Sequence, residues 1–533
     1  MKYCLQLSLL FILLNITTST CKSTIFYGDS SNYTNYIKSL VAGDTLILSS
    51  GNYQRNLTLN KLQGTKGKPI VISGNGNSTV FQGQSCCNTI SITQCAFLVI
   101  KNIKLDGMFQ LIDAVKAEGT IDNWAHDITI EYLTIANYGA SQQNVGISTK
   151  CPAWNFIIRK NRIIGAGTGM YLGNSDGTKP FVDGVIEYNY IANTIGYNIE
   201  IKHQFNGQRE LLPGTSVNGK TVIRHNVFTK DESSSSGVNA RPNVLVGGFP
   251  TIGWGKDDYY EIYGNFFYNN PVEALFQGTG NIIMYANIFV NNFDPSGFRA
   301  VYFTPQNGVS PQNIKVFHNT IWTANTTGGI RLYNPNANYR QSCSANAVFS
   351  ALPITNFTDT LNNVSDSYLK ANTYLISPSA SIESLNLYPL NGQLKGFQTS
   401  DSLLHNFTEW NRDFNGEEFN WEYKGAYSGC CKNMGWKLQL DTMSFSKSTT
   451  TVKLPDPEPE ISVFPNPTTD ILNIRLSSST QSIINIYSIT GENIYSKKIN
   501  NLQENIDISS IPSGVYFLNI TSGTTNFYKK IIK

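Results

Sequence analysis

The sequence contains little charge and, beyond its first twenty residues, no long apolar run. Only 14% of its 533 residues are charged, and 40 Lys and Arg against 37 Asp and Glu give a formal net charge of +3. This near balance argues against a nucleic-acid-binding protein, which needs a basic surface. No apolar stretch after residue 20 approaches the roughly 20 residues of a membrane-spanning helix, so we expect no transmembrane segment.

Glycine and aromatic residues are plentiful instead, with 43 Gly, 28 Tyr and 28 Phe. Low charge with many aromatic and β-branched residues excludes a coiled coil and a disordered chain. The composition favours a large all-β protein with a sizeable core.

The first 20 residues have the pattern of a secretory signal peptide. Lys2 precedes the apolar stretch 5–16, and small polar residues follow up to Thr20. Cleavage next to Cys21 leaves open a lipid on that cysteine. We expect ordinary cleavage, because residues 18–20 match a lipoprotein signal poorly.

Export permits disulfide bonds among the remaining cysteines. Neighbouring residues lie only about 3.8 Å apart at Cα, which is shorter than ordinary disulfide geometry. We therefore expect Cys86 or Cys87 to pair with Cys95 rather than with each other. The cysteine spacings match no zinc-binding pattern.

Six asparagines mark an irregular repeat, at intervals of 22 to 39 residues. Each has an apolar residue three positions before it and another two positions after it. Such intervals lie in the range of solenoid coils. We predict a parallel β-helix in which the asparagines form a hydrogen-bonded ladder at successive bends: Asn161, Asn189, Asn226, Asn265, Asn287 and Asn319.

Composition divides the chain into four parts. Residues 1–20 are the signal peptide, and residues 21–443 are expected to form the β-helix. Residues 444–460 are polar and end in alternating prolines, which is typical of an exposed linker. Residues 461–533 contain short alternating strands with glycine turns. The expected fold class is all-β, a right-handed parallel β-helix followed by a small antiparallel β-sandwich.

The beginning of the β-helix region resembles a known superfamily. The segments GDTLIL at residues 43–48 and KNIKLDG at residues 101–107 resemble the opening coils of the pectin-lyase-like β-helices. Among these proteins they are most similar to the chondroitinase B and alginate lyase family. The resemblance implies a polysaccharide substrate.

The C-terminal part resembles the sorting domain of the type IX (Por) secretion system. The matching segments are FPNPT at residues 464–468, IYSITG at 486–491, GVYF at 514–517 and the basic end KKIIK at 529–533. The resemblance implies export by the type IX machinery of a Bacteroidota-like bacterium. The processed protein is then expected to be secreted or attached to the outer-membrane surface.

Strand alternation at residues 197–204 gives the leading candidate site. It places Tyr197 and Ile199 inside, and Asn198, Glu200 and Lys202 together on the outer surface. Long polar loops follow at residues 205–219 and 231–237. Such loops on neighbouring coils are natural walls of a substrate groove.

A lyase for a uronate polysaccharide must neutralise the sugar carboxylate, remove the proton beside it and protonate the leaving oxygen. In the chondroitinase B and alginate lyase family, a Lys and an Arg on the next coil fill the base and acid roles beside a calcium ion. The resemblance implies these roles for Lys202 and Arg241, with His203 beside them. Calcium prefers oxygen ligands, which Asn198 and Glu200 would supply. We expect the substrate to contact four further residues: Arg224, His225, Trp254 and Tyr259.

Two other functions stay open. The same groove could bind a glycan without cleaving it, as in an adhesin. Asp257 and Asp258 resemble the paired carboxylates of polygalacturonases, which are glycoside hydrolases. The expected function is a secreted or surface-bound, monomeric, carbohydrate-active protein, most concretely a polysaccharide lyase acting by β-elimination.

Overall fold

The computed structural model describes residues 23–119, 123–294, 297–324, 326–398, 404–444, 462–476, 481–522 and 525–533. The expected signal peptide and Cys21 lie outside these residues, as does the expected linker beyond Ser444. The chain divides into two compact units, Met1–Ser446 and Lys447–Lys533.

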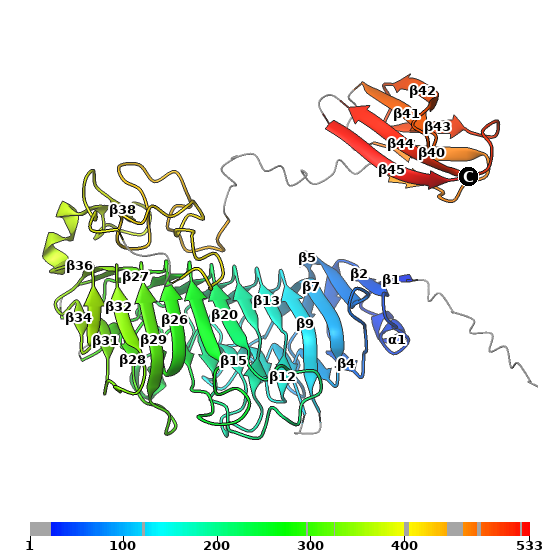
Figure 1. Ribbon diagram of the computed structural model, residues 1–533. Coiled ribbons are helices and arrows are strands. Elements are labelled where there is room, and N and C mark those ends of the chain that lie inside the picture. The colour runs from blue at the N-terminus through cyan, green and yellow to red at the C-terminus, as the bar shows by residue number, and fades with distance from the viewer. Residues whose placement is uncertain are drawn as a thin grey trace, which may run out of the picture. The chain divides into compact units, whose positions relative to one another are not determined.

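Three parallel sheets run along the first unit, with one strand of each sheet per coil (Figure 1). Sheet 1 contains β1 (Ile25–Gly28), β2 (Thr45–Leu48), β5 (Ile70–Gln82), β7 (Ala96–Asp106), β9 (Ala125–Glu131), β13 (Ile157–Arg159), β17 (Val185–Glu187), β20 (Lys220–Arg224), β23 (Tyr259–Tyr263), β26 (Gly280–Tyr285), β29 (Pro311–Phe317), β32 (Gln341–Ser344) and β35 (Asp359–Leu361). The short strands β12 (Ala153–Trp154) and β16 (Phe181–Val182) pair at its edge.

Sheet 2 shares the long strands β5 and β7 with sheet 1. Its other strands are β3 (Gly51–Tyr53), β10 (Thr134–Ala136), β14 (Arg162–Ile164), β18 (Tyr190–Ala192), β21 (Val227–Thr229), β24 (Phe266–Tyr268), β27 (Ile288–Asn291), β30 (Thr320–Thr323), β33 (Ala347–Phe349) and β36 (Val364–Asp366).

Sheet 3 contains β4 (Leu57–Asn60), β6 (Ile90–Thr93), β8 (Val115–Ala117), β11 (Val145–Thr149), β15 (Thr168–Leu172), β19 (Ile199–Ile201), β22 (Val244–Val246), β25 (Phe276–Gly278), β28 (Arg299–Phe303), β31 (Gly328–Leu332) and β34 (Ile354–Thr355). Helix α1 (Tyr33–Ile37) packs near β1, and the 3-10 turns are η1 (Gly237–Asn239) and η2 (Tyr368–Thr373). The predicted parallel β-helix is confirmed.

The core lies inside the coils, because each strand turns alternate side chains inward. In sheet 3 the inward row is apolar in coil after coil, and each member is at most 1% exposed: Ile90, Val115, Ile147, Met170, Ile199, Val244, Phe276, Val301 and Ile330. Full burial of such a side chain contributes about 1.5–3 kcal/mol to folding. This row holds the strands that carry the outward-facing residues in register.

An asparagine ladder follows the bend between sheets 1 and 2. In each step the backbone N–H and the Nδ2 atom of one asparagine donate to the Oδ1 atom of the asparagine in the next coil, at 2.9–3.1 Å. The six predicted members are confirmed, and Asn346 and Asn363 extend the ladder. The residue before each ladder asparagine has a positive φ, and His225 and His318 occupy two of these bend positions.

The C-terminal part of the first unit covers the outer faces of sheets 1 and 2, and we call it the covering segment. It contains η2, β37 (Leu375–Ser377), β38 (Asn386–Pro389) and the chain up to residue 443. Leu387, Phe414 and Trp436 pack against the outer side chains of sheet 2. Leu404 and Trp421 belong to a cluster with the outer side chains of sheet 1. Neither apolar cluster includes a residue of sheet 3.

The second unit is a small antiparallel β-sandwich, as predicted. One sheet contains β39 (Ser462–Phe464), β40 (Ile471–Arg475) and β43 (Gln503–Asp507). The other contains β42 (Asn493–Ile499), β41 (Ser482–Tyr487), β44 (Val515–Ser522) and β45 (Thr525–Ile532). Side chains from both sheets form one apolar core of its own, which includes Leu472, Ile484, Ile506 and Leu518.

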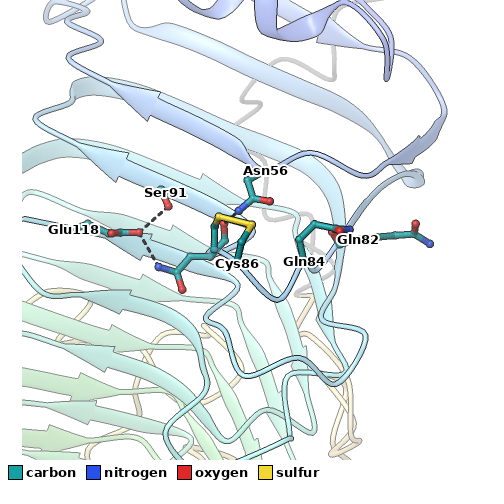
Figure 2. The surroundings of a disulfide bond; sticks show 8 residues. Asn56, Gln82, Gln84, Cys86, Ser91 and Glu118 are labelled. Atoms are coloured by element: carbon teal, nitrogen blue, oxygen red, sulfur yellow. Dashed lines mark hydrogen bonds between the residues drawn. A yellow bond between two sulfur atoms is a disulfide. The ribbon is translucent and has the colours of Figure 1, made fainter.

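The expected pairing of Cys86 or Cys87 with Cys95 is wrong. Cys86 is bonded to Cys87, and Cys430 is bonded to Cys431. Cys95 is a buried free thiol, and its Sγ atom lies 3.5 Å from the backbone oxygen of Leu59. Figure 2 shows the first disulfide in a loop beside the strands, near Asn56 and Gln84. Cys95 points into the coil, whereas this loop is exposed outside it.

Candidate functional site

A cleft of about 660 Å³ lies on the outer face of sheet 3. The strands β8, β11, β15 and β19 form its floor, and their outward residues stand in register as Lys116, Ser148, Tyr171 and Glu200. The loop at residues 142–144, Tyr197 and Arg241 are also part of the lining. The inward apolar row therefore places these polar side chains at the spacing of neighbouring strands.

Four basic side chains and two carboxylates line the cleft. Glu200 Oε1 accepts from Lys202 Nζ at 2.7 Å, and Lys116 Nζ lies 3.7 Å from Asp113 Oδ2. Lys150 and Arg241, in contrast, have no carboxylate within 4.0 Å among the residues that the structure describes. The cleft therefore holds two uncompensated positive charges and suits an anionic ligand.

Among the basic residues that line the cleft, Lys150 is strongly perturbed by its surroundings. Its Nζ atom lies 3.3 Å from the centroid of the Tyr171 ring, and Lys202 Nζ lies 5.6 Å from the same centroid. Burial lowers the pKa of Lys150 to about 8, although the charge of Asp113 opposes the change. A lysine with such a pKa exists in part as the neutral amine near neutral pH and can accept a proton.

Lys150 and Lys202 occupy equivalent positions on coils that are two apart. Each follows its strand, β11 or β19, at the position that Gly173 holds on the coil between them. Gly173 has φ +87°, and a Cβ atom there would lie 3.3 Å from the Cβ of Lys202. The glycine therefore leaves the space between the two lysines open.

Arg241 reaches the cleft from the loop after β21. Lys230, which is almost fully buried, donates to the backbone oxygen of Arg241 at 2.9 Å and to Ser235 Oγ at 2.9 Å. Gln142 Nε2 donates to the backbone oxygen of Asn239 at 3.2 Å and joins this loop to the opposite wall. The Arg241 guanidinium lies 5.8 Å from the centroid of the Tyr197 ring. The loop thus presents one cation to the cleft, and the ring of Tyr197, just before β19, lies beside it.

The structure brings three of the predicted site residues together, namely Lys202, Arg241 and Glu200. Tyr197 lines the cleft as well, whereas alternation predicted it inside. Asn198, predicted outside, is fully buried, and its Nδ2 atom faces Ile191 O and Thr194 Oγ1. Both predictions fail because β19 begins only at Ile199, so the alternation does not extend back to these two residues.

His203 lies beside the cleft rather than in it. Its side chain is buried, its Nδ1 atom lies 2.9 Å from Asn307 Nδ2, and its ring contacts Phe205 edge-on at 4.9 Å. Burial and the charge of Lys202 lower its pKa. His203 is therefore neutral at neutral pH and joins two loops.

The predicted substrate contacts lie elsewhere. Arg224 projects from sheet 1 and pairs with Glu187 and with Glu409 of the covering segment. His225 pairs with the same Glu409 at 3.0 Å. Tyr259 packs on Phe407 of that segment, with 6.2 Å between ring centroids. Trp254 lies in the loop before β23, where its backbone N–H donates to Glu210 Oε1 at 3.2 Å. None of these four residues lines the cleft.

Asn198 and Glu200 do not fit a calcium site. Calcium takes six to eight oxygen ligands, as a rule with an excess of carboxylates. Glu200 is instead paired with Lys202, with Lys150 nearby, and Asn198 points its side chain into the coil. Within the described residues no group of three or more His, Cys, Asp or Glu is placed to hold a metal ion.

Asp257 and Asp258 do not form the pair of catalytic carboxylates that a glycoside hydrolase needs. Asp258 is buried and forms an ion pair with the buried Arg209, which anchors the loop at residues 205–219. Burial raises the pKa of Asp258 to about 6. Asp257 is exposed. Asp258 therefore stabilises this loop, and neither aspartate lines the cleft.

Sequence reasoning missed Lys116, Asp113, Lys150 and Tyr171. Three of these residues lie on coils before the first ladder asparagine, where the repeat was not recognised. A signal was present in the strand endings IST-Lys150 and IEI-Lys202, which place a lysine directly after a short strand. Aligning those two strands would have paired the lysines.

Comparison with known proteins identifies the second unit. Residues 462–533 match the family described as the secretion system C-terminal sorting domain. The second unit is a sorting domain. It directs the chain to type IX secretion and attachment at the cell surface. No helix in the described part of the first unit or of the sorting domain is long and apolar enough to cross a membrane.

No curated protein matches the chain in sequence. Among solved structures, an alginate lyase from Paenibacillus sp. str. FPU-7 is 18% identical, covers 60% of this chain and 98% of its own, and has a TM-score of 0.42. The pectate lyase Pel9A is 12% identical, with coverage of 76% and 96% and a TM-score of 0.38. A PL6 family polysaccharide lyase from Pseudopedobacter saltans is 12% identical, with coverage of 69% and 97% and a TM-score of 0.35. Similarities at this level establish no shared activity.

Proposed function

We propose that the first unit is a polysaccharide lyase that cleaves an acidic, uronate-containing glycan in the cleft on sheet 3. The proposal is carried by Lys150, a partly buried lysine in a cleft with excess positive charge. Its pKa is lowered to about 8, and no carboxylate of the described residues lies within ion-pair distance of it. A general base works best when its pKa lies near the working pH. An anionic sugar is the ligand that this charge favours.

The cleft contains a group for each step of β-elimination. Arg241 and Lys202 neutralise the uronate carboxylate, which makes the proton on the adjacent ring carbon more acidic. Neutral Lys150 removes that proton. The electron pair forms the double bond as the glycosidic oxygen leaves. Burial raises the pKa of Tyr197, so its hydroxyl stays protonated and can donate to the leaving oxygen.

In this mechanism the base is Lys150, whereas the sequence resemblance implied Lys202. Lys202 is held by Glu200 in an ion pair at 2.7 Å. The charged Lys202 also repels a proton on Lys150. Lys202 thus binds the substrate carboxylate, and Lys150 accepts the proton.

Cleavage in heavy-oxygen water separates the possible functions. The full chain is incubated with alginate, polygalacturonate, chondroitin or ulvan, and the products are analysed by mass spectrometry. Elimination yields an unsaturated end, and at early times its products carry no heavy oxygen, because water does not enter the cleaved bond. A hydrolase would yield no unsaturated end and would place the label on the anomeric carbon of each new reducing end, while the glycosidic oxygen stays on the other product. Binding without any product would support the non-catalytic alternative.

A further inference from the structure

A second basic and aromatic patch lies on the same outer face of sheet 3, away from the cleft. It consists of Arg299, Tyr302, Arg331 and Tyr333, from β28, β31 and the residue after β31; we call it the distal patch. The Arg331 guanidinium lies 5.6 Å from the centroid of Tyr302 and 5.5 Å from that of Tyr333. One arginine therefore stands between two tyrosine rings, one of which is exposed.

The two arginines of the distal patch lack an anionic partner. Neither has a carboxylate within 4.0 Å in the part of the chain that the structure describes. Arg299 donates from Nη1 to the backbone oxygen of Phe298, but its buried Nε atom has no hydrogen-bond partner. Burial and the charge of Arg331 both lower the pKa of Arg299. Two mutually repelling cations held together in this way favour binding of an anion.

The position of Arg299 is built into the coil. It pairs in register with Gly328 of β31, and a Cβ atom on Gly328 would lie 2.0 Å from the Cδ of Arg299. Any other residue at position 328 would therefore displace the arginine side chain. The guanidinium forks of two arginines match the geometry of carboxylate oxygens.

The distal patch and the cleft belong to one row of side chains. The outward residues of sheet 3 run in register from Tyr171 and Glu200 through Leu245 and Gln277 to Tyr302. Four strand spacings separate Tyr171 from Tyr302, which is about 19 Å along the coil axis. Leu245 and Gln277, which separate Glu200 from Tyr302, are uncharged and partly exposed. Glu200 itself is paired with Lys202 at 2.7 Å, which reduces its repulsion of an acidic ligand.

We propose that the distal patch binds a second acidic sugar unit of the same polysaccharide chain that occupies the cleft. Arg299 and Arg331 hold the sugar carboxylate, and Tyr302 and Tyr333 offer ring faces to the sugar. This inference rests on the proposed function. It adds that the protein prefers long chains and grips them at two points, so that it cleaves within the chain rather than at its end.

The test measures polymer binding by the full chain in which Lys150→Ala prevents turnover. Titration calorimetry with sodium alginate, polygalacturonate and chondroitin sulfate gives the dissociation constant at low salt. Adding Arg331→Ala or Arg299→Ala should raise the dissociation constant of the preferred polymer about tenfold, since each removes a charge-assisted contact. Arg340→Ala removes an exposed arginine from the loop before β32 and serves as the matched control, with binding unchanged. Arg331→Lys should recover part of the affinity because it restores the charge without the fork.

The outcomes separate the two claims. If the parent binds a polymer and the Arg331→Ala and Arg299→Ala variants bind it equally well, the distal patch is overturned and the proposed function stands. If the parent binds none of the three polymers and does not bind ulvan either, both are overturned. If binding depends on Arg331 but the unmodified chain yields no cleavage product, the distal patch is supported and the lyase is overturned.

Discussion

Lys150 and Lys202 show how two identical side chains acquire different chemistry from their surroundings. They follow equivalent strands two coils apart and share the ring of Tyr171. Glu200 holds Lys202 at hydrogen-bond distance. Lys150 has no such partner and is partly removed from water, so its charged form is disfavoured.

Activity should therefore rise with pH through the pKa of Lys150, about 8, and level off above it, because only the neutral amine accepts a proton. Lys150→Arg should lower the rate at least about 100-fold, since a guanidinium stays protonated. The initial rate measured from pH 6 to 10 on the preferred polymer tests both statements. Lys66→Arg, at an exposed turn, is the control and should leave the profile unchanged. A flat profile, or full activity in Lys150→Arg, contradicts the assignment.

Removal of divalent metal should not lower the activity. The residues that sequence analysis indicated as calcium ligands are an inward-facing amide, Asn198, and an ion-paired carboxylate, Glu200. The basic side chains of the cleft take over neutralisation of the substrate carboxylate. The rate is compared before and after dialysis against a chelator. A loss that added calcium restores would show that the cleft chemistry has been assigned incorrectly.

Three of the six charged residues that line the cleft were predicted from the sequence: Glu200, Lys202 and Arg241. Alternation around Ile199 and Ile201 placed Glu200 and Lys202 outside, but the loops predicted as walls, at residues 205–219 and 231–237, contribute no residue to the cleft. Lys150 was missed because its importance arises from burial and from contacts with other coils, which a single strand does not reveal. His225 was predicted to contact the substrate, but it occupies a ladder bend and pairs with Glu409.

At the level of elements, the asparagine ladder is what the sequence revealed most fully. Asparagine is the residue at each bend because its Oδ1 accepts from the asparagine of the preceding coil, while its Nδ2 donates to backbone oxygens and to the Oδ1 of the next asparagine. The flanking apolar residues repeat with it because they point into the coil. The covering segment was not predicted, because its packing on sheets 1 and 2 depends on contacts between residues more than a hundred positions apart.

Asn265→Ala should destabilise the first unit by about 3 kcal/mol, because the buried backbone N–H of Asn226 loses its acceptor and Asn226 Nδ2 loses one of its three acceptors. Urea unfolding followed by tryptophan fluorescence measures the effect, and all seven tryptophans precede Lys447, so the signal reports on the first unit alone. Asn52→Ala, at an exposed position of β3, should shift the free energy of unfolding by less than about 0.5 kcal/mol. Equal shifts in the two variants would mean that the ladder contributes nothing beyond ordinary asparagine packing.

At the scale of the whole molecule, the chain consists of two units with separate cores, one containing the cleft and the other being the sorting domain. The cleft lies entirely in the first unit, and the sorting domain has its own apolar core. The sequence predicted this division because the β-helix repeat and the sorting segments have different patterns.

A chain that ends at Ser446 should keep its activity on polysaccharide and lose its attachment to the cell surface. The first unit contributes every residue of the cleft, so the rate of the purified truncated protein should match that of the full chain. Cell fractionation followed by an activity assay measures both properties in one experiment. A truncated protein that folds but fails to cleave would show that the sorting domain takes part in the reaction.

The most direct test of the account is the ultraviolet absorbance of unsaturated uronate, followed while the full chain acts on each acidic polymer. The account predicts a steady rise on at least one polymer, which disappears in Lys150→Ala and persists in Lys66→Ala. A rise that persists in Lys150→Ala would contradict Lys150 as the base. Cleavage without any rise in absorbance would contradict elimination itself.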